Sequence, residues 1–126
     1  THCVQDSEGA DFAEGLEVPE SAHIIDKGVD SNIDSYSAFF DNGGIRATGL
    51  GGLLKEKGVT EVYILGLATD YCVKFTALDA CKLGFETYLV EDGCRGVELS
   101  AGDIAQAITD MKAAGVKVLQ SEELKL

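Results

Sequence analysis

Short apolar runs alternate with longer amphipathic stretches along the chain, and this pattern predicts strands and helices in turn. Short β-rich apolar runs, typical of strands covered on both faces, lie at 61–65, 86–90 and 116–119. Helical spacing of apolar residues predicts helices over about 48–57, 70–83 and 101–114. A further run from His23 to Asp26 is predicted as another strand.

Three of these strands follow a predicted helix across a glycine, at Gly58, Gly84 and Gly115. Glycine is the usual residue just past a helix end because it enters the left-handed conformation without a Cβ penalty. Regular alternation of helices and strands is typical of a parallel sheet with helices on both faces. The sequence therefore predicts the α/β class and a single domain over residues 1–126.

Charge and cysteine content narrow the range of functions. The net charge of −12 makes nucleic acid or an anionic membrane surface an unsuitable partner. The longest apolar runs are far shorter than the ~20 residues that span a bilayer. The four cysteines form no CxxC pair, and Thr1 opens no signal peptide. We therefore expect free thiols in a reducing compartment, the cytoplasm.

Polar and reactive residues follow the predicted strands, where parallel α/β sheets bind their ligands. Cys72 lies in the first turn predicted after the strand at 61–65, with Thr69 or Asp70 as a natural N-cap. Backbone N–H groups at a helix start favour a thiolate, and Lys27, after the strand at 23–26, would add a cation. The turn before Cys72 could also aim N–H donors at a developing oxyanion.

A structural role is the alternative for each of these residues. A lone helical cysteine is more often a small buried hydrophobe, most lysines are solvated, and Tyr36 in its loop could simply pack onto the domain. Cys81 lies among aliphatic residues and is predicted to be core, while Cys94 is predicted to be structural within a loop.

Four motifs in order resemble the nicotinamidases of the isochorismatase-like cysteine hydrolase family. Residues 66–77 resemble the family's nucleophile segment, and residues 34–42 resemble its active-site loop. The family's metal-binding histidine segment is similar to 1–10, and its catalytic lysine matches Lys27 within 26–28. The resemblance covers nearly the whole chain and implies the family's three-layer α/β/α fold, with the N-terminal strands missing.

The resemblance implies a hydrolysis of nicotinamide to nicotinate and ammonia that serves NAD salvage. Cys72 would attack the carboxamide carbon to give a thioester, and Lys27 would stabilise the thiolate. The N–H groups of Ala68 and Cys72 would form the oxyanion hole, with a cis peptide at Leu67–Ala68. Tyr36 would lie at the substrate. His2 would bind a divalent metal (zinc, iron or manganese), zinc being preferred.

The family's catalytic Asp and its other metal ligands would precede Thr1, so we expect residues 1–126 alone to be inactive or nearly so. The missing N-terminal segment or a second copy of the chain would then be a partner. Two alternatives stay open. One is a related amidohydrolase acting on N-carbamoyl or ureido substrates, and the other is a non-catalytic α/β interaction fragment that captures strands at an exposed sheet edge.

Overall fold

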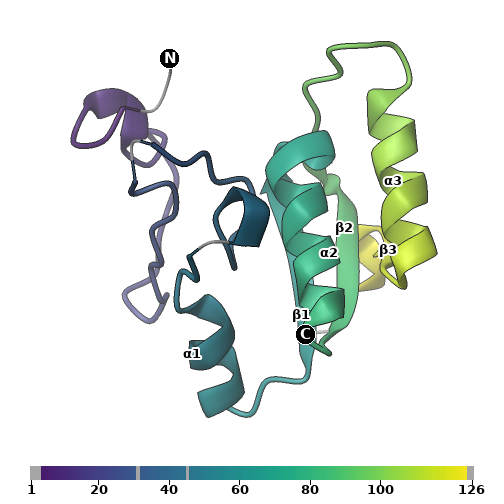
Figure 1. Cartoon of the computed structure of the whole chain (residues 1–126). Coiled ribbons are helices and arrows are strands. Elements are labelled where there is room, and N and C mark those ends of the chain that lie inside the picture. The colour runs from purple at the N-terminus through teal and green to yellow at the C-terminus, as the bar shows by residue number, and fades with distance from the viewer. Residues whose placement is uncertain (1–3, 31, 45, 125–126) are drawn as a thin grey trace.

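A three-stranded parallel sheet forms the centre of the molecule in the computed structural model, which describes residues 4–30, 32–44 and 46–124. In spatial order its strands are β1 (Glu61–Leu67), β2 (Glu86–Arg95) and β3 (Lys117–Leu119). The helices are α1 (Leu50–Glu56), α2 (Lys74–Lys82) and α3 (Asp103–Ala114). The predicted α/β class and parallel sheet are confirmed, and Figure 1 shows α2 lying across the sheet beside α3.

Helix-glycine-strand junctions shape the chain as the sequence predicts. Gly115 ends α3 with a φ of 108°, and its N–H bonds back to the Lys112 carbonyl at 3.1 Å. Gly84 follows α2 with a φ of 92°. A side chain at either place would be strained, so these glycines fix where each helix stops and the next strand begins.

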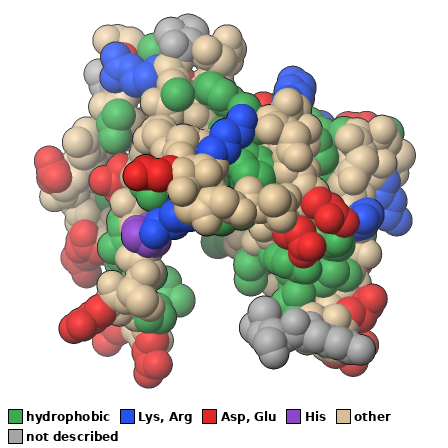
Figure 2. Space-filling view, turned by 90° about the horizontal axis from the view of Figure 1, so that it is seen from below, with side chains coloured by type: hydrophobic (Ala, Val, Ile, Leu, Met, Phe, Trp, Pro, Cys, Tyr) green, Lys and Arg blue, Asp and Glu red, His purple; other side chains and the backbone are tan. Residues whose placement is uncertain are grey.

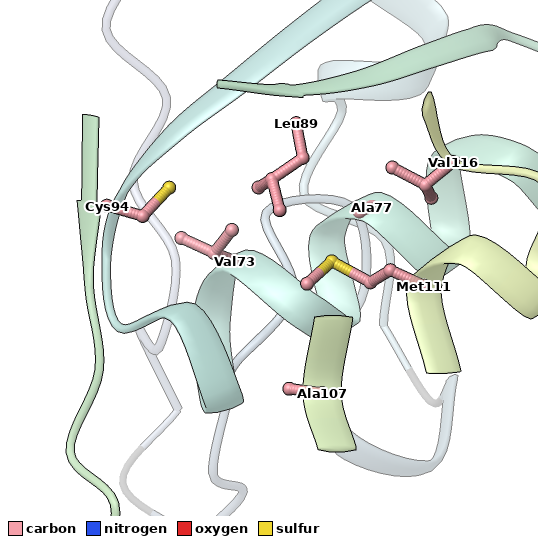
Figure 3. Packing of buried hydrophobic residues seen from close by; sticks show 7 residues of the cluster. All are labelled: Val73, Ala77, Leu89, Cys94, Ala107, Met111 and Val116. Carbon is pink, nitrogen blue, oxygen red and sulfur yellow. The ribbon is translucent and has the colours of Figure 1, made fainter. Parts of the chain in front are cut away.

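Apolar side chains of α2 and α3 meet those of β2 in the main core (Figure 3). Leu89 and Met111 are completely buried there, and Val73 carries the core up to the turn that precedes α2. A second cluster joins Phe39, Ala80 and Phe85 and draws α1 and the 36–44 loop onto the same face. The large buried side chains stabilise the fold by about 1.5–3 kcal/mol each.

The opposite face of the sheet is exposed among the described residues. Side chains of β1 alternate, so that Tyr63 and Leu67 keep 44% and 74% of their surface accessible. Tyr63 stacks on Tyr88 of β2 at 4.6 Å, and the Lys117 ammonium lies 5.3 Å from the Tyr88 ring. The apolar runs predict helices on both faces, but the described helices cover only one. Seen from below, the surface shows hydrophobic side chains exposed among acidic ones (Figure 2).

The structure corrects the strand expected at His23–Asp26. These residues have no strand partner among the described parts of the chain, and Ile24 is 60% exposed. Local β propensity predicts a strand here, but a strand requires a neighbour to satisfy its backbone groups. Figure 1 shows this N-terminal part, in purple and blue, running apart from the sheet.

Two further boundaries differ from the prediction. The helix expected over 70–83 is a π-helical turn at Thr69–Val73 followed by α2, so Cys72 lies in that turn and not in the first turn of an α-helix. The strand expected at 86–90 continues to Arg95, which places Cys94 in a strand and not in a loop. No helix in the described ranges combines the length and the apolar character that crossing a membrane requires.

Candidate active site

The turn that carries Cys72 begins directly where β1 ends. The peptide bond between Leu67 and Ala68 is cis, as the family resemblance predicts. The N–H groups of Tyr71 and Val73 then both donate to the Ala68 carbonyl, at 3.1 and 3.0 Å. This wraps the turn tightly around Ala68, and Cys72 sits in it half-buried. The nucleophile candidate is therefore held by the backbone at the carboxyl end of a parallel strand, where α/β folds place their sites.

Lys27 and Cys72, separated by 45 residues in sequence, meet at this turn. The Lys27 ammonium donates to the Cys72 sulfur at 3.4 Å and to the Ser35 carbonyl at 3.0 Å. The sulfur thus receives a hydrogen bond from a positively charged donor, an arrangement typical of reactive cysteines. The pairing predicted from the sequence is thus formed, although the segment that carries Lys27 is not a strand.

Thr76 ties the nucleophile turn to the loop that contains Tyr36. Its hydroxyl donates to the Cys72 carbonyl at 2.6 Å and accepts the Ala38 N–H at 2.9 Å. Sequence reasoning assigns Thr76 no role, because its partner at residue 38 becomes a neighbour only through the fold. One hydroxyl therefore sets the distance between the Cys72 turn and the 35–38 loop.

Tyr36 belongs to an aromatic cluster at the start of α2. Its ring lies 5.5 Å from that of Tyr71, edge to face, and is stacked 5.7 Å from that of Phe75. A cavity of about 490 Å³ opens beside Tyr36 and Phe75, but neither Cys72 nor Lys27 lines it. Tyr36 is thus anchored next to the nucleophile turn by its own domain, and its contact with substrate stays a prediction.

Cys81 and Cys94 lie in surroundings unlike that of Cys72. Cys94 is 4% exposed and directs its sulfur at the Val90 carbonyl at 3.3 Å. Burial raises the pKa of the Cys94 thiol and keeps it protonated and inert. Cys81 packs against the main core, as its sequence neighbours predict. Among the described cysteines, Cys72 is the one that receives a hydrogen bond from a cation.

Asp70 does not cap the helix start, as either it or Thr69 was expected to do. The residue at that position is Ala68, without a side-chain cap, and the Asp70 carboxylate instead accepts the N–H groups of Val97 and Glu98. Burial acts to raise the pKa of Asp70, but these N–H donors outweigh it and the pKa is lowered. No local sequence signal could have identified partners 27 and 28 residues away.

The expected metal ligand His2 lies outside the described residues. Within residues 4–30, 32–44 and 46–124, no group of three or more His, Cys, Asp or Glu side chains is placed to hold a metal ion. The described residues therefore do not form a metal centre by themselves.

Replacing Gly96 by alanine will destabilise the fold. A Cβ at this position would lie 2.6 Å from the Ile104 Cδ1 atom and 3.2 Å from an Asp70 carboxylate oxygen. Moving these groups costs about 1–3 kcal/mol, which chemical denaturation will detect as a lower free energy of unfolding. The matched change Gly52→Ala meets no atom within 4 Å inside α1, so it should stabilise by about 0.5–1 kcal/mol. Equal effects of the two variants would contradict the close approach at Gly96.

Comparison with known families matches residues 1–123 to the isochorismatase domain. A nicotinamidase from Escherichia coli is 48% identical over 114 residues, covering 90% of this chain and 54% of that protein. One from Acinetobacter baylyi is 42% identical over 124 residues, covering 98% and 58%. The chain spans just over half the length of these two nicotinamidases.

Solved structures place the fold in the same group. A nicotinamidase/pyrazinamidase from Acinetobacter baumannii superposes with a TM-score of 0.93 at 46% identity, covering 99% of this chain and 60% of that one. The zinc complex of a pyrazinamidase from Pyrococcus horikoshii gives 0.81 at 42%, covering 95% and 62%. An N-carbamoylsarcosine amidase from Thermoplasma acidophilum, at 22% identity and a TM-score of 0.76, shares the fold.

Proposed function

This chain belongs to the isochorismatase family, and from that premise we propose that its protein hydrolyses nicotinamide to nicotinate and ammonia. The observation that carries the proposal is the contact of 3.4 Å between the Lys27 ammonium and the Cys72 sulfur. An exposed lysine usually keeps its ammonium hydrated. Here the Lys27 ammonium instead donates a hydrogen bond to the Cys72 sulfur, as expected beside a nucleophilic cysteine.

The proposed reaction proceeds through a thioester. The Cys72 thiolate attacks the carboxamide carbon, and the carbonyl electrons move onto oxygen, where the N–H groups of Ala68 and Cys72 stabilise the charge. Collapse of this intermediate expels the amine, which takes up one proton and leaves as ammonia. Water then adds to the thioester, and the same sequence releases nicotinate and regenerates the thiolate. The net change is one amide and one water converted to one carboxylic acid and ammonia.

Protonation of the departing amine is a role that a carboxylic acid commonly fills in such sites. No described carboxylate forms a hydrogen bond or an ion pair with Cys72 or Lys27. We therefore propose that residues 1–126 on their own turn over nicotinamide slowly, and that a carboxylate outside them completes the site. Without that carboxylate the rate would be lower, and the nucleophile would remain in place.

The aromatic surroundings favour a flat heteroaromatic amide over the linear N-carbamoyl compounds. Tyr36, Tyr71 and Phe75 form one cluster next to the Cys72 turn, and aromatic faces bind planar rings well.

In the relatives, zinc is present in the Pyrococcus horikoshii complex, which supports the proposal that His2 binds a divalent metal, zinc being preferred. Free thiols at Cys72, Cys81 and Cys94 suit a reducing compartment such as the cytoplasm, where the reaction would serve NAD salvage.

Ammonia release tests the proposal. The protein that carries this chain, and residues 1–126 alone, are each incubated with nicotinamide and with an N-carbamoyl amino acid. We expect the former to release ammonia from nicotinamide in preference, and the latter to be at least about 100-fold slower, since an acid-base group contributes roughly 10²–10⁴-fold. No turnover of nicotinamide by the protein that carries this chain would refute the substrate. Full activity of residues 1–126 would show that the acid lies within them.

A further inference from the structure

Asp70 joins two segments that are distant in sequence, the nucleophile turn and the loop that follows β2. One carboxylate oxygen accepts the Val97 N–H at 2.9 Å, and the other accepts the Glu98 N–H at 2.8 Å. Both oxygens are therefore engaged by consecutive backbone donors. Hydrogen bonds to an ionised carboxylate are stronger and more directional than neutral ones, so this pair fixes both the position and the orientation of Asp70.

The loop is shaped to receive this carboxylate. Glu98 adopts a left-handed φ of 53°, which is uncommon for a residue other than glycine. Gly96 lets the loop approach, because a Cβ there would collide with Ile104 and come within 3.2 Å of an Asp70 oxygen. A backbone conformation of this kind persists only where the surrounding contacts maintain it, and the two bonds to Asp70 are such contacts.

Asp70 is two residues from Cys72 in a turn of only five residues. At its start the turn is held by the Ala68 carbonyl, which accepts the N–H groups of Tyr71 and Val73. Toward α2 it is held by Thr76, whose hydroxyl donates to the Cys72 carbonyl. Asp70 supplies the tether on the side that faces the 96–98 loop. The turn that carries Cys72 is thus held at three points, by the Ala68 carbonyl, the Thr76 hydroxyl and the Asp70 carboxylate.

We infer that Asp70 is a positioning residue that, through the 96–98 loop, holds the Cys72 sulfur against the Lys27 ammonium. The inference rests on the proposed role of Cys72 as the nucleophile, but not on the identity of the amide. Asp70 touches neither Cys72 nor Lys27 in any described hydrogen bond. Its effect is therefore transmitted through the backbone of the turn.

The charge of Asp70 and its tether have opposite effects on Cys72, which makes the inference testable. A nearby negative charge disfavours a thiolate, so removing that charge alone would ease ionisation of Cys72. Loss of the tether would instead free the turn, separate the sulfur from Lys27, and make ionisation harder. The direction in which the pH dependence of Cys72 reactivity moves therefore distinguishes the two roles.

The experiment measures alkylation of Cys72 by iodoacetamide as a function of pH, located by peptide mass spectrometry, in the protein that carries this chain. In Asp70→Asn, the amide presents an N–H group where one backbone donor needs an acceptor. We expect the alkylation midpoint to rise by about one pH unit and the rate below that midpoint to fall about tenfold. Asp70→Glu keeps the charge but displaces the carboxylate, and should shift in the same direction.

Asp92→Asn is the matched control, because the Asp92 carboxylate in β2 also accepts two hydrogen bonds, from the N–H and hydroxyl of Ser121 at the start of a 3₁₀ turn. This variant should change the rate of Cys72 alkylation by less than about twofold relative to the unmodified protein, as expected for independent sites. Continued protection of the buried Cys94 thiol verifies that each variant is folded. A midpoint that falls or stays unchanged in folded Asp70→Asn would overturn the inference. Since no substrate is used, this outcome is independent of whether nicotinamide is hydrolysed.

Discussion

Replacing Cys72 by alanine is expected to abolish the proposed hydrolysis of nicotinamide by the protein that carries this chain. The proposed thioester cannot form without the sulfur, and removal of a nucleophile from a catalytic unit costs roughly 10⁴-fold or more in kcat. Steady-state ammonia release measures the loss, and intact mass under rapid quench should show a nicotinoyl adduct in the unmodified protein that the variant lacks.

Cys81→Ala serves as the control for a general loss of thiol content. Cys81 packs against the main core and makes no described contact with Lys27, so the variant should retain kcat within about twofold, as expected for a site independent of the chemistry. Substantial hydrolysis by Cys72→Ala would show that another group attacks the amide, and the thioester mechanism would have to be abandoned.

The Lys27→Met variant is expected to show the second largest loss. Methionine keeps most of the chain length but removes both the hydrogen bond to the Cys72 sulfur and the one to the Ser35 carbonyl. We expect kcat/KM to fall by roughly 10²–10³-fold, the effect typical of losing one electrostatic stabiliser in an active site.

Lys117→Met is the matched control for Lys27→Met. Lys117 pairs with Glu86 at 2.7 Å on the exposed face of the sheet, away from the nucleophile turn. Its removal should leave kcat/KM within about twofold, since exposed ion pairs contribute little. Equal losses in the two variants would mean that Lys27 acts through overall charge and not through its contact with Cys72.

Elements with strong local signals were predictable from the sequence. The helix of residues 101–114 has one apolar stripe and ends at a glycine, and the structure forms α3 over Asp103–Ala114 with Ala107 and Met111 buried. Both signals act within a few residues of each other. The Lys27–Cys72 contact was also predictable, from the residue roles that the family resemblance implies and, for Cys72 alone, from the rule that sites form at strand ends.

Features that depend on distant partners were not predictable. The apolar run at His23–Asp26 has the composition of a strand, yet nothing in the described residues pairs with it. Asp70 is of a residue type that often caps helices, yet its carboxylate accepts the backbone N–H groups of Val97 and Glu98. In both cases local propensity is the same for either outcome, and only the tertiary arrangement selects one.

Comparative alkylation of the cysteines tests the central claim most directly. Iodoacetamide is applied at neutral pH to the unmodified protein and to Lys27→Met, and the modified peptides are quantified over time. We predict that Cys72 reacts at least about tenfold faster than Cys81 and Cys94, and that Lys27→Met removes most of this advantage, because the variant loses the cationic hydrogen-bond donor at the sulfur. Equal rates for the three thiols, or an unchanged Cys72 rate in Lys27→Met, would contradict the claim that the Lys27 ammonium activates the Cys72 sulfur.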